Sequence, residues 1–492
     1  MPQDPAHAGA TDPLLLRVAT ALALAALVAM AAASGSFRWA ENRLDELVFT
    51  LGERSASGQI HVVEMDAASI AAIQNWPWSR EHYARVVERL DRAGVRSISF
   101  DVDFSSRSGP AEDAAFAAAI GAAAAPVALP TFAQHARFRE GRQLDSLPIA
   151  PLREEASLAS VAIIPDHDGF VRRMPLGTVT GATARPSIAA FVAGRAGRVS
   201  ESFPIDFAIS PATIPRHSFI AIERGEFDPE ALEGRDVIIG ATAIELGDRY
   251  PVPRHGVIPG VIVQALAAET LLDAVPVYGS WQAPLVLGMV LAFLIGTIRR
   301  RRHVMMCGVL ATLVLGGFSL AAHHRLAVWF EIVPALFLVM IATLLRLFIL
   351  TTRQAEARRC TDGESGLPNK LALDRNALAG ERGYFVAAQI DDFDALKLAA
   401  GPDNVGPLLR RVVERLIATG CAEVIYRIDT RTLVWWTPLD LADLEPVLAG
   451  LRAVMHSPLE VAGRRLGVSV SVGVAPADRA SRGGCMQQAK TA

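Results

Sequence analysis

Aspartates follow two β-rich runs of the sequence, at the places where strands would end. Asp66 closes the run 60–66, and Asp101 and Asp103 close the run 97–103. In open α/β sheets, ligands sit in the crevice outside the carboxyl ends of the strands. The positions therefore predict carboxylates that line a small-ligand pocket. The alternative, in which they cap helices or accept hydrogen bonds from loop amides, is equally consistent with the sequence.

Two tryptophans lie close to the first of these aspartates. Trp76 and Trp78 precede Arg80, where a helical pattern over 80–93 begins after Ser79. Their rings could form the aromatic wall of a pocket. The apolar spacing of the helical stretch favours the other interpretation, in which both rings are packing anchors that set this helix against the sheet. Arg80 is a further candidate for ligand contact.

Asp248 is the last charged candidate in this part of the chain. Arg249 follows it directly, and Arg172 and Arg173 stand earlier in the sequence. The sequence predicts either an ion pair between Asp248 and one of these arginines or a carboxylate that faces a ligand. No pattern identifies that ligand, which is expected to be an unknown small molecule.

Strands and helices alternate in the segment that carries these residues. The runs 60–66 and 97–103 flank the helical stretch 80–93, and 236–241 is a short continuous apolar run that suits a strand buried on both faces. Such alternation is typical of a mostly parallel sheet with helices on its faces. Residues 36–275 are therefore expected to form an α/β domain.

Apolar segments on both sides of this domain predict membrane spans. Each has roughly the length that crosses a hydrocarbon core about 30 Å thick, the second only if residues 277–282 extend it. A buried core helix is a poor alternative, because three of the segments follow one another with only short basic loops between them. We expect one transmembrane helix at 14–34 and three between 280 and 350. The apolar segments cover residues 14–33, 283–298, 304–322 and 327–345.

Arginines indicate the orientation of these spans. A basic loop at 299–302 and the arginines at 353, 358 and 359 belong in the cytoplasm by the positive-inside rule. The N-terminus, residues 1–13, is then cytoplasmic, the α/β domain is periplasmic, and the connector 351–361 leads to a cytoplasmic domain at 362–492. This is the topology of a multi-pass protein of a bacterial inner membrane. Cleavage of the first span as a signal peptide near 31–34 is the alternative.

Composition and cysteine usage exclude several functional classes. The net charge of −3 and the pI of about 6.4 do not suggest nucleic-acid binding, while the mean hydropathy of +0.30 agrees with a membrane protein. No cysteine falls in the exported segment, so a disulfide framework is not expected there, and without a C-x-x-C pair a zinc or redox site is not expected either. The cysteines are Cys307, Cys360, Cys421 and Cys485.

Several motifs between residues 38 and 275 together resemble the extracellular sensor family called CHASE, type 2. Their order and spacing carry the resemblance, since each is weak alone, and the arrangement of one span before the domain and three after it is also the habit of that family. The resemblance implies an extracytoplasmic sensor. The matching residues are Asp66 with Ser69, 76–80, 101–104, 168–175, 234–242, 248–251, and 259–261 with Gln264 and Ala265.

Residues 362–492 resemble the frame of a GGDEF domain, the diguanylate cyclase module. The opening 362–370, the helix 408–416 and the strand 468–475 match the pattern of that family. The resemblance implies an α/β (α+β, cyclase-like) fold. It also implies a homodimer, because the cyclase family joins two GTP-loaded domains.

The residues that would perform the cyclase chemistry are changed. The position of a family metal ligand holds Gln389, and a neutral amide is a poor ligand for Mg²⁺. The guanine-contacting asparagine falls on Lys397, and the later guanine-contacting aspartate falls near Gly406. Nucleotide binding by these family positions is therefore left open.

The signature hairpin at 427–436 shows the same loss. The two family glycines fall on Asp429 and Thr430, and the two acidic positions fall on Arg431 and Thr432. A cation at a metal-binding position repels Mg²⁺. The sequence therefore predicts a catalytically degenerate domain, a pseudoenzyme without catalytic residues, metal or cofactor. Mg²⁺ and GTP would be needed only if residual cyclase activity existed.

Three hypotheses for the cytoplasmic domain follow. It could relay a signal by contact with a cytoplasmic protein partner, which exposed Trp435 or Trp436 would support. It could be a diguanylate cyclase with an altered site that makes cyclic di-GMP from two GTP. It could bind GTP or cyclic di-GMP without turnover.

Overall fold

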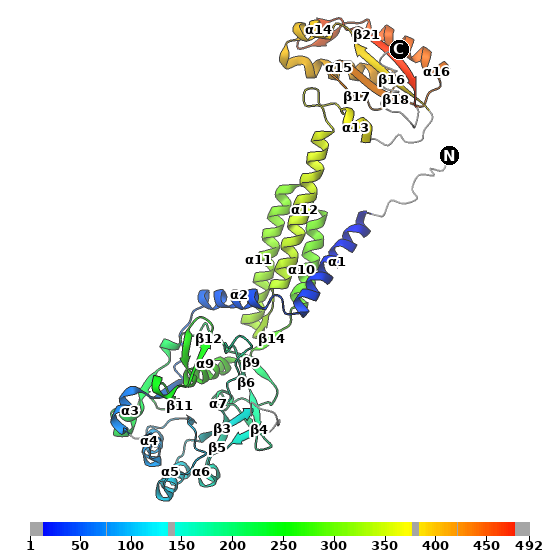
Figure 1. Ribbon diagram of the computed structural model, residues 1–492. Helices are drawn as coiled ribbons and strands as arrows, with labels where there is room; N and C mark the ends of the chain where they lie inside the picture. The colour runs from blue at the N-terminus through cyan, green and yellow to red at the C-terminus, as the bar shows by residue number, and fades with distance from the viewer. Residues whose placement is uncertain (1–12, 75, 136–142, 376–382, 421, 478–492) are drawn as a thin grey trace. The chain divides into compact units, whose positions relative to one another are not determined.

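The computed structural model describes residues 13–74, 76–135, 143–375, 383–420 and 422–477. The chain forms two compact units, the first made of residues 1–298 with 302–343 and the second of 299–301 with 344–492. Figure 1 shows the elements of both units. Cys421 and Cys485 lie outside the described residues.

A seven-stranded sheet forms the centre of the predicted exported domain, the α/β region expected at residues 36–275. Its strand order is β10-β1-β11-β2-β3-β4, with β5 also paired to β3. The pairs are parallel except that β4 runs antiparallel to β3. The predicted α/β fold of this segment is thus confirmed. The strands are β1 (Ile60–Met65), β2 (Ser97–Asp101), β3 (Val127–His135), β4 (Gln143–Ser146), β5 (Ser157–Ser160), β10 (Arg216–Ser218) and β11 (Asp236–Ala241).

Helices cover both faces of this sheet because its central strands are apolar on both sides. In β1, Val63 and Met65 join one core, while Ile60 and Val62 join the other. On the first face lie α3 (Ala67–Ile73), α4 (Arg80–Arg92), α5 (Pro110–Ala122), α6 (Ala150–Glu155) and α8 (Phe219–Arg224). On the second face lie α7 (Ile188–Val192) and α9 (Gly260–Asp273).

Short strand pairs and 3-10 turns complete this domain. They border the carboxyl ends of the central strands, where loops are long enough to form a site. The antiparallel pairs are β6 (Arg173–Pro175) with β9 (Ser202–Pro204), β7 (Gly177–Thr180) with β8 (Thr183–Pro186), and β12 (Arg249–Val252) with β13 (Gly256–Pro259). The 3-10 turns are η1 (Pro211–Thr213) and η2 (Ile244–Leu246).

Two of the described helices are long and apolar enough to cross a membrane. They are α11 (Arg301–Leu326), of which the first 23 residues qualify, and α12 (Val333–Arg359). The helix α10 (Gln282–Thr297) is apolar but shorter. The helix α1 (Pro13–Ala33) is followed by α2 (Arg38–Leu51), whose axis turns by 83° from it. The arrangement of one transmembrane helix before the α/β domain and three after it remains a prediction.

Residues 277–281 do not extend the second apolar segment as a helix, which was the condition for its crossing a membrane. The strand β14 (Val277–Gly279) pairs in parallel with β15 (Val328–Phe330), and α10 begins only at Gln282. The pairing of β14 with β15 therefore sets the start of α10, although hydropathy alone would predict a longer helix. The fourth span, predicted from residue 327, begins later, at Val333.

The second unit contains a four-stranded antiparallel sheet with the order β17-β18-β16-β21. The helix expected over 408–416 and the strand expected over 468–475 are present with shifted ends. The strands are β16 (Tyr384–Ile390), β17 (Tyr426–Arg427), β18 (Thr432–Thr437) and β21 (Val470–Pro476), with a separate pair β19 (Leu459–Val461) and β20 (Arg464–Leu466). The helices are α13 (Lys370–Arg375), α14 (Phe393–Ala400), η3 (Pro402–Asn404), α15 (Val405–Ala418) and α16 (Leu441–Met455).

Candidate functional site

A cavity of about 1290 Å³ lies at the carboxyl ends of the central strands of the exported domain. The last residues of β1, β2 and β11, which are Met65, Asp101 and Ala241, all line it. The hairpin of β12 and the loops around β7 and β9 supply the other walls. This is the edge where an open α/β sheet places ligands.

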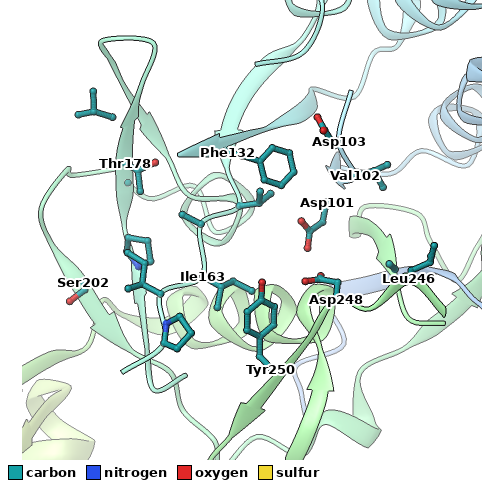
Figure 2. A pocket seen from close by; sticks show the side chains of 18 of the residues that line it. Asp101, Val102, Asp103, Phe132, Ile163, Thr178, Ser202, Leu246, Asp248 and Tyr250 are labelled. Carbon is teal, nitrogen blue, oxygen red and sulfur yellow. The ribbon is translucent and has the colours of Figure 1, made fainter. Parts of the chain in front are cut away.

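Three polar side chains converge in this cavity. Figure 2 shows Asp101, at the end of β2, close to Asp248 and Tyr250, which come from the start of β12. Burial and then the nearby charge of Asp248 raise the pKa of Asp101 from 3.8 to about 8. Burial also raises the pKa of Asp248, and a hydrogen bond with Tyr250 opposes that rise. Near neutral pH the carboxyl group of Asp101 therefore holds its proton.

Two glycines allow these carboxylates to approach the backbone. A Cβ atom at Gly260, the first residue of α9, would collide with the carboxylate of Asp248. A Cβ atom at Gly240 in β11 would lie 2.7 Å from Cβ of Val261 and 3.2 Å from Cβ of Asp101. Close packing at these glycines thus fixes both acids at the cavity wall.

The cavity lining is acidic and aromatic. Asp103 lines it too, although its carboxylate also accepts bonds from the amide and hydroxyl of Ser105 at 2.9 and 3.0 Å. Among the described residues that form the lining, no lysine, arginine or histidine occurs. The five acidic residues are Asp101, Asp103, Glu201, Glu245 and Asp248, and the three aromatic residues are Trp76, Phe132 and Tyr250.

Three of the predicted site residues do not line the cavity. Asp66 is the N-cap of α3, where it accepts bonds from the amide and hydroxyl of Ser69 at 2.9 and 2.5 Å. Trp78 is 3% exposed and packs on Phe219, with ring centroids 5.0 Å apart. These are the capping and packing interpretations that the sequence left open.

Arg80 also belongs to the core rather than to the cavity lining. Its guanidinium donates to the carbonyl oxygen of Ser106 at 3.0 Å and lies 3.7 Å from Asp113. It also lies 4.5 Å from the ring centroid of Phe104. Trp76, in contrast, is 53% exposed and lines the cavity, so the two tryptophans have different positions.

The predicted pairing of Asp248 with an arginine is wrong. Arg172 pairs instead with Asp166 and Asp168, at 2.9 and 2.8 Å. Arg249 points along its own hairpin and donates to the carbonyl oxygen of Val257 at 2.9 Å. Although Arg249 directly follows Asp248 in the sequence, the two side chains do not pair, because neighbouring residues of an extended chain point to opposite faces.

Sequence reasoning missed several cavity residues. Tyr250 stands two residues after Asp248 in β12, so the alternation of side chains along a strand could have identified it. Phe132, Glu201 and Glu245 come from separate loops and strands, and no local pattern connects them.

Replacing Asp101 with Asn is expected to remove a pH dependence from the stability of the exported domain. The pKa of Asp101 is raised to about 8 in the folded protein, so the folded state holds the proton of this carboxyl group more tightly than the unfolded state does. The stability that Asp101 contributes is therefore fully present below about pH 4 and is lost as the pH rises through 8. Water in the cavity screens the effect, so we expect D101N to be more stable than the natural protein near pH 9 by about 1–3 kcal/mol. Thermal unfolding at several pH values measures this, with E88Q on the exposed surface of α4 as the control. Parallel pH curves for D101N and the natural chain would contradict the assignment.

The hairpin of the second unit keeps its shape through a different set of contacts. The chain turns between β17 and β18 over residues 428–431, and the carboxylate of Asp429 accepts bonds from the amides of Arg431 and Thr432 at 3.1 and 2.8 Å. Thr430 contributes its carbonyl oxygen to Arg427 at 2.9 Å. An aspartate-centred turn therefore stands where the family has two glycines.

Arg431 and Gln389 face one another across the strands β18 and β16. With the amide oxygen of Gln389 turned toward the guanidinium, it accepts bonds from Nε and Nη2 of Arg431 at 2.9 and 2.8 Å. Within the described residues, no group of three or more histidine, cysteine or acidic side chains could hold a metal ion. The guanidinium of Arg431 therefore lies where the pattern of the GGDEF family places a metal ion.

The two remaining family positions differ in kind. Lys397 lies exposed on α14. Gly406 is buried at the start of α15, where a Cβ atom would collide with the carbonyl oxygen of Glu364. Gly406 is therefore a packing residue that lets α15 approach the loop at 362–366, and it offers no side chain for a base.

Neither tryptophan of the hairpin strand is exposed. Trp435 is fully buried in the core of the second unit, and Trp436 is partly buried. Neither ring therefore supplies the partner-contact surface that an exposed tryptophan would have indicated.

Several solved structures are similar to part of this chain. Solved structures similar to the chain include a diguanylate cyclase/phosphodiesterase from Caldicellulosiruptor saccharolyticus, at 19% identity and a TM-score of 0.25, over 28% of this chain and 86% of that chain. The GGDEF domain of FimX from Pseudomonas aeruginosa matches at 16% identity and 0.24, over 27% and 90%. A sensory box/GGDEF family protein from Caulobacter crescentus matches at 22% identity and 0.22, over 27% and 94%.

No curated protein sequence matches the chain. The family model described as the CHASE2 domain matches residues 21–298, which is more than half of the 492 residues. The matched region contains the parallel sheet, the cavity and the carboxylates at its strand ends. The chain therefore belongs to the CHASE2 domain family.

Proposed function

We propose that this protein is a transmembrane receptor of the cyclic di-GMP signalling type, which detects a small extracytoplasmic molecule and relays the signal to a catalytically degenerate cytoplasmic domain. The observation that carries the proposal is the cavity at the strand ends of a CHASE2 domain. Its volume is large enough for a small organic ligand, and sites of that kind combine apolar walls with a few convergent polar groups.

The chemistry of the cavity favours a ligand with a positively charged group. Asp101 and Asp248 face one another, and the rings of Phe132, Tyr250 and Trp76 line the same space. A cation would neutralise the charge of the carboxylates and could also lie against an aromatic face. Binding would displace the proton held by Asp101, so affinity should rise with pH toward 8.

The membrane placement is the one that the arginines favour. The first span and the three later spans would cross a bacterial inner membrane, with the CHASE2 domain in the periplasm and residues 362–492 in the cytoplasm. The two helices long enough to cross, α11 and α12, support it. A homodimer is proposed from the resemblance to the cyclase family.

The cytoplasmic domain is proposed to act by binding a protein partner or a nucleotide. The pair of Arg431 and Gln389 and the turn around Asp429 support the loss of catalysis, because they fill the metal and glycine positions with other contacts. A ligand can shift this domain only through different affinities for two states of the exported domain. The helix α12, which runs without a break from Val333 to Arg359, is the covalent path for such a change.

Ligand binding by the full-length protein in lipid nanodiscs tests the proposal. Thermal unfolding would be followed with a set of small primary amines and with carboxylic acids of matched size. We expect at least one amine to raise the unfolding temperature, and we expect D248N and D101N to remove that shift while E88Q keeps it. If acids stabilise the protein, or if the shift survives in both variants, the cavity is not the proposed cation site.

Diguanylate cyclase activity is the alternative function for the cytoplasmic domain. The resemblance of the frame 362–492 to that family supports it, and the changed residues oppose it. Formation of cyclic di-GMP from GTP distinguishes the two proposals.

A further inference from the structure

The helix α2 has one side that is fixed by contacts within the first unit. The carboxylate of Glu41 accepts bonds from the amides of Ile332 and Val333, at 2.8 and 3.0 Å, where α12 begins. Two turns later, Phe49 is 5% exposed and its ring lies 5.1 Å from that of Trp329. Residues spaced by four lie on one face of a helix, so these contacts fix the rotation of α2 about its axis.

The opposite side of α2 is apolar and exposed. Trp39, Leu47 and Leu51 are 73%, 59% and 87% exposed, and they follow one another at multiples of four residues along the helix. Arg43 lies between them, with its guanidinium 5.9 Å from the ring centroid of Trp39. Burial of each leucine side chain would contribute about 1.5–3 kcal/mol of free energy, which exposure to water forgoes. An exposed apolar stripe of this kind therefore marks an interaction surface.

The position of α2 in the chain identifies what covers this stripe. It begins after a break of four residues from the apolar helix α1 and turns by 83° from it. Figure 1 shows α2 running across the ends of the bundle formed by α1, α10, α11 and α12. The stripe thus belongs to a helix that directly follows an apolar helix and lies crosswise to it. Tryptophan and arginine, which join an apolar body to a polar end, are the residue types enriched where headgroups meet acyl chains.

We propose that α2 is an interfacial helix whose stripe of Trp39, Leu47 and Leu51 lies in the boundary between headgroups and acyl chains of the outer leaflet. The inference rests on the membrane placement proposed above. A helix with one apolar face and one polar face lies in the plane of such a surface. Because Glu41 binds the backbone amides at the start of α12, a change in the depth of α2 in the lipid would also move the first turn of α12.

Spin labels on the full-length chain in nanodiscs of phosphatidylethanolamine and phosphatidylglycerol test this inference. The four native cysteines are replaced by serine, and single labels are placed with L47C or L51C. Two reference labels complete the set, L313C on the exposed side of α11 and E88C on α4. None of these side chains is buried, so the labels replace no core contact.

For each label, the collision rate with oxygen is divided by the collision rate with a water-soluble nickel chelate. We expect this collision ratio to be several-fold higher for the labels at 47 and 51 than for the label at 88. Their collision ratios should approach that of the label at 313. Ratios equal to that at 88 would overturn the inference. Shielding from both reagents, with dipolar coupling between copies, would also overturn it, because a second copy of the chain would then cover the stripe.

The failure of this inference and that of the proposed function are distinguishable. If the label at 313 contacts lipid while those at 47 and 51 contact water, α2 is not interfacial but the membrane placement holds. If the label at 313 contacts water, the membrane placement fails and the inference fails with it. Amine binding in the cavity is measured separately and does not depend on either result.

Discussion

The purified full-length protein in nanodiscs, supplied with GTP and Mg²⁺, is expected to form no detectable cyclic di-GMP. Phosphoryl transfer depends on metal ions and charged groups that stabilise the developing charge, and removal of such groups typically costs about 10²–10⁵-fold in rate. Here the guanidinium of Arg431 is bonded to Gln389, at 2.9 and 2.8 Å, in the place that the family pattern assigns to metal ligands. We therefore expect turnover at least about 10³-fold below that of an active cyclase measured in parallel.

The variant carrying R431E and T432E is the companion to this measurement. It restores two acidic side chains, but Gln389 and Lys397 remain and the turn keeps Asp429 in place of glycine. We expect this variant to stay inactive. Adding Q389D to it would complete the carboxylates near the hairpin and could raise binding of Mg²⁺ without restoring turnover. Product formed by the natural protein at a rate near that of the reference cyclase would establish it as an enzyme.

Replacing Arg427 with Ala is expected to destabilise the second unit by about 1.5–3 kcal/mol, because the carboxylates it leaves are partly exposed to water. Arg427 is 6% exposed, and its guanidinium contacts four partners. It pairs with Asp362 at 2.6 Å and Glu364 at 2.9 Å, and donates to the carbonyl oxygens of Asp429 and Thr430. Its removal leaves two carboxylates without their cation and releases the hairpin from the loop at 362–366.

Thermal and urea unfolding of the full-length protein measure this change, with a probe in the second unit. R411A is a matched control, because Arg411 pairs with Glu414 on the exposed surface of α15, and surface pairs contribute about 0–1 kcal/mol. R427K should recover only part of the loss, since an ammonium group cannot reproduce the planar fork of contacts. An unfolding transition of R427A equal to that of R411A would contradict the anchoring role.

Much of the fold followed from local patterns. The spacing of Tyr83, Val86 and Leu90 predicted α4, and all three are buried in one core. The uniformly apolar run at 236–241 predicted a central strand, and β11 pairs on both sides with parallel neighbours. Such patterns are reliable because one face of an element must be buried whatever its partner is.

The site was less predictable because its residues meet through tertiary structure. Asp101 and Asp66 both follow strands, yet Asp101 points into the cavity while Asp66 caps α3. The difference depends on Ser69 and Ser218, which surround Asp66 with hydroxyl donors. Neither the acidic pair of Asp101 with Asp248 nor the bond between Arg431 and Gln389 is encoded in neighbouring residues.

The bond between Arg431 and Gln389 also limits how this chain could regain a metal site by mutation. If Gln389 alone became aspartate, Arg431 would hold it in an ion pair. If Arg431 alone became glutamate, it would face an amide that offers no charge to a cation. Neither single change therefore brings two carboxylates together at this position.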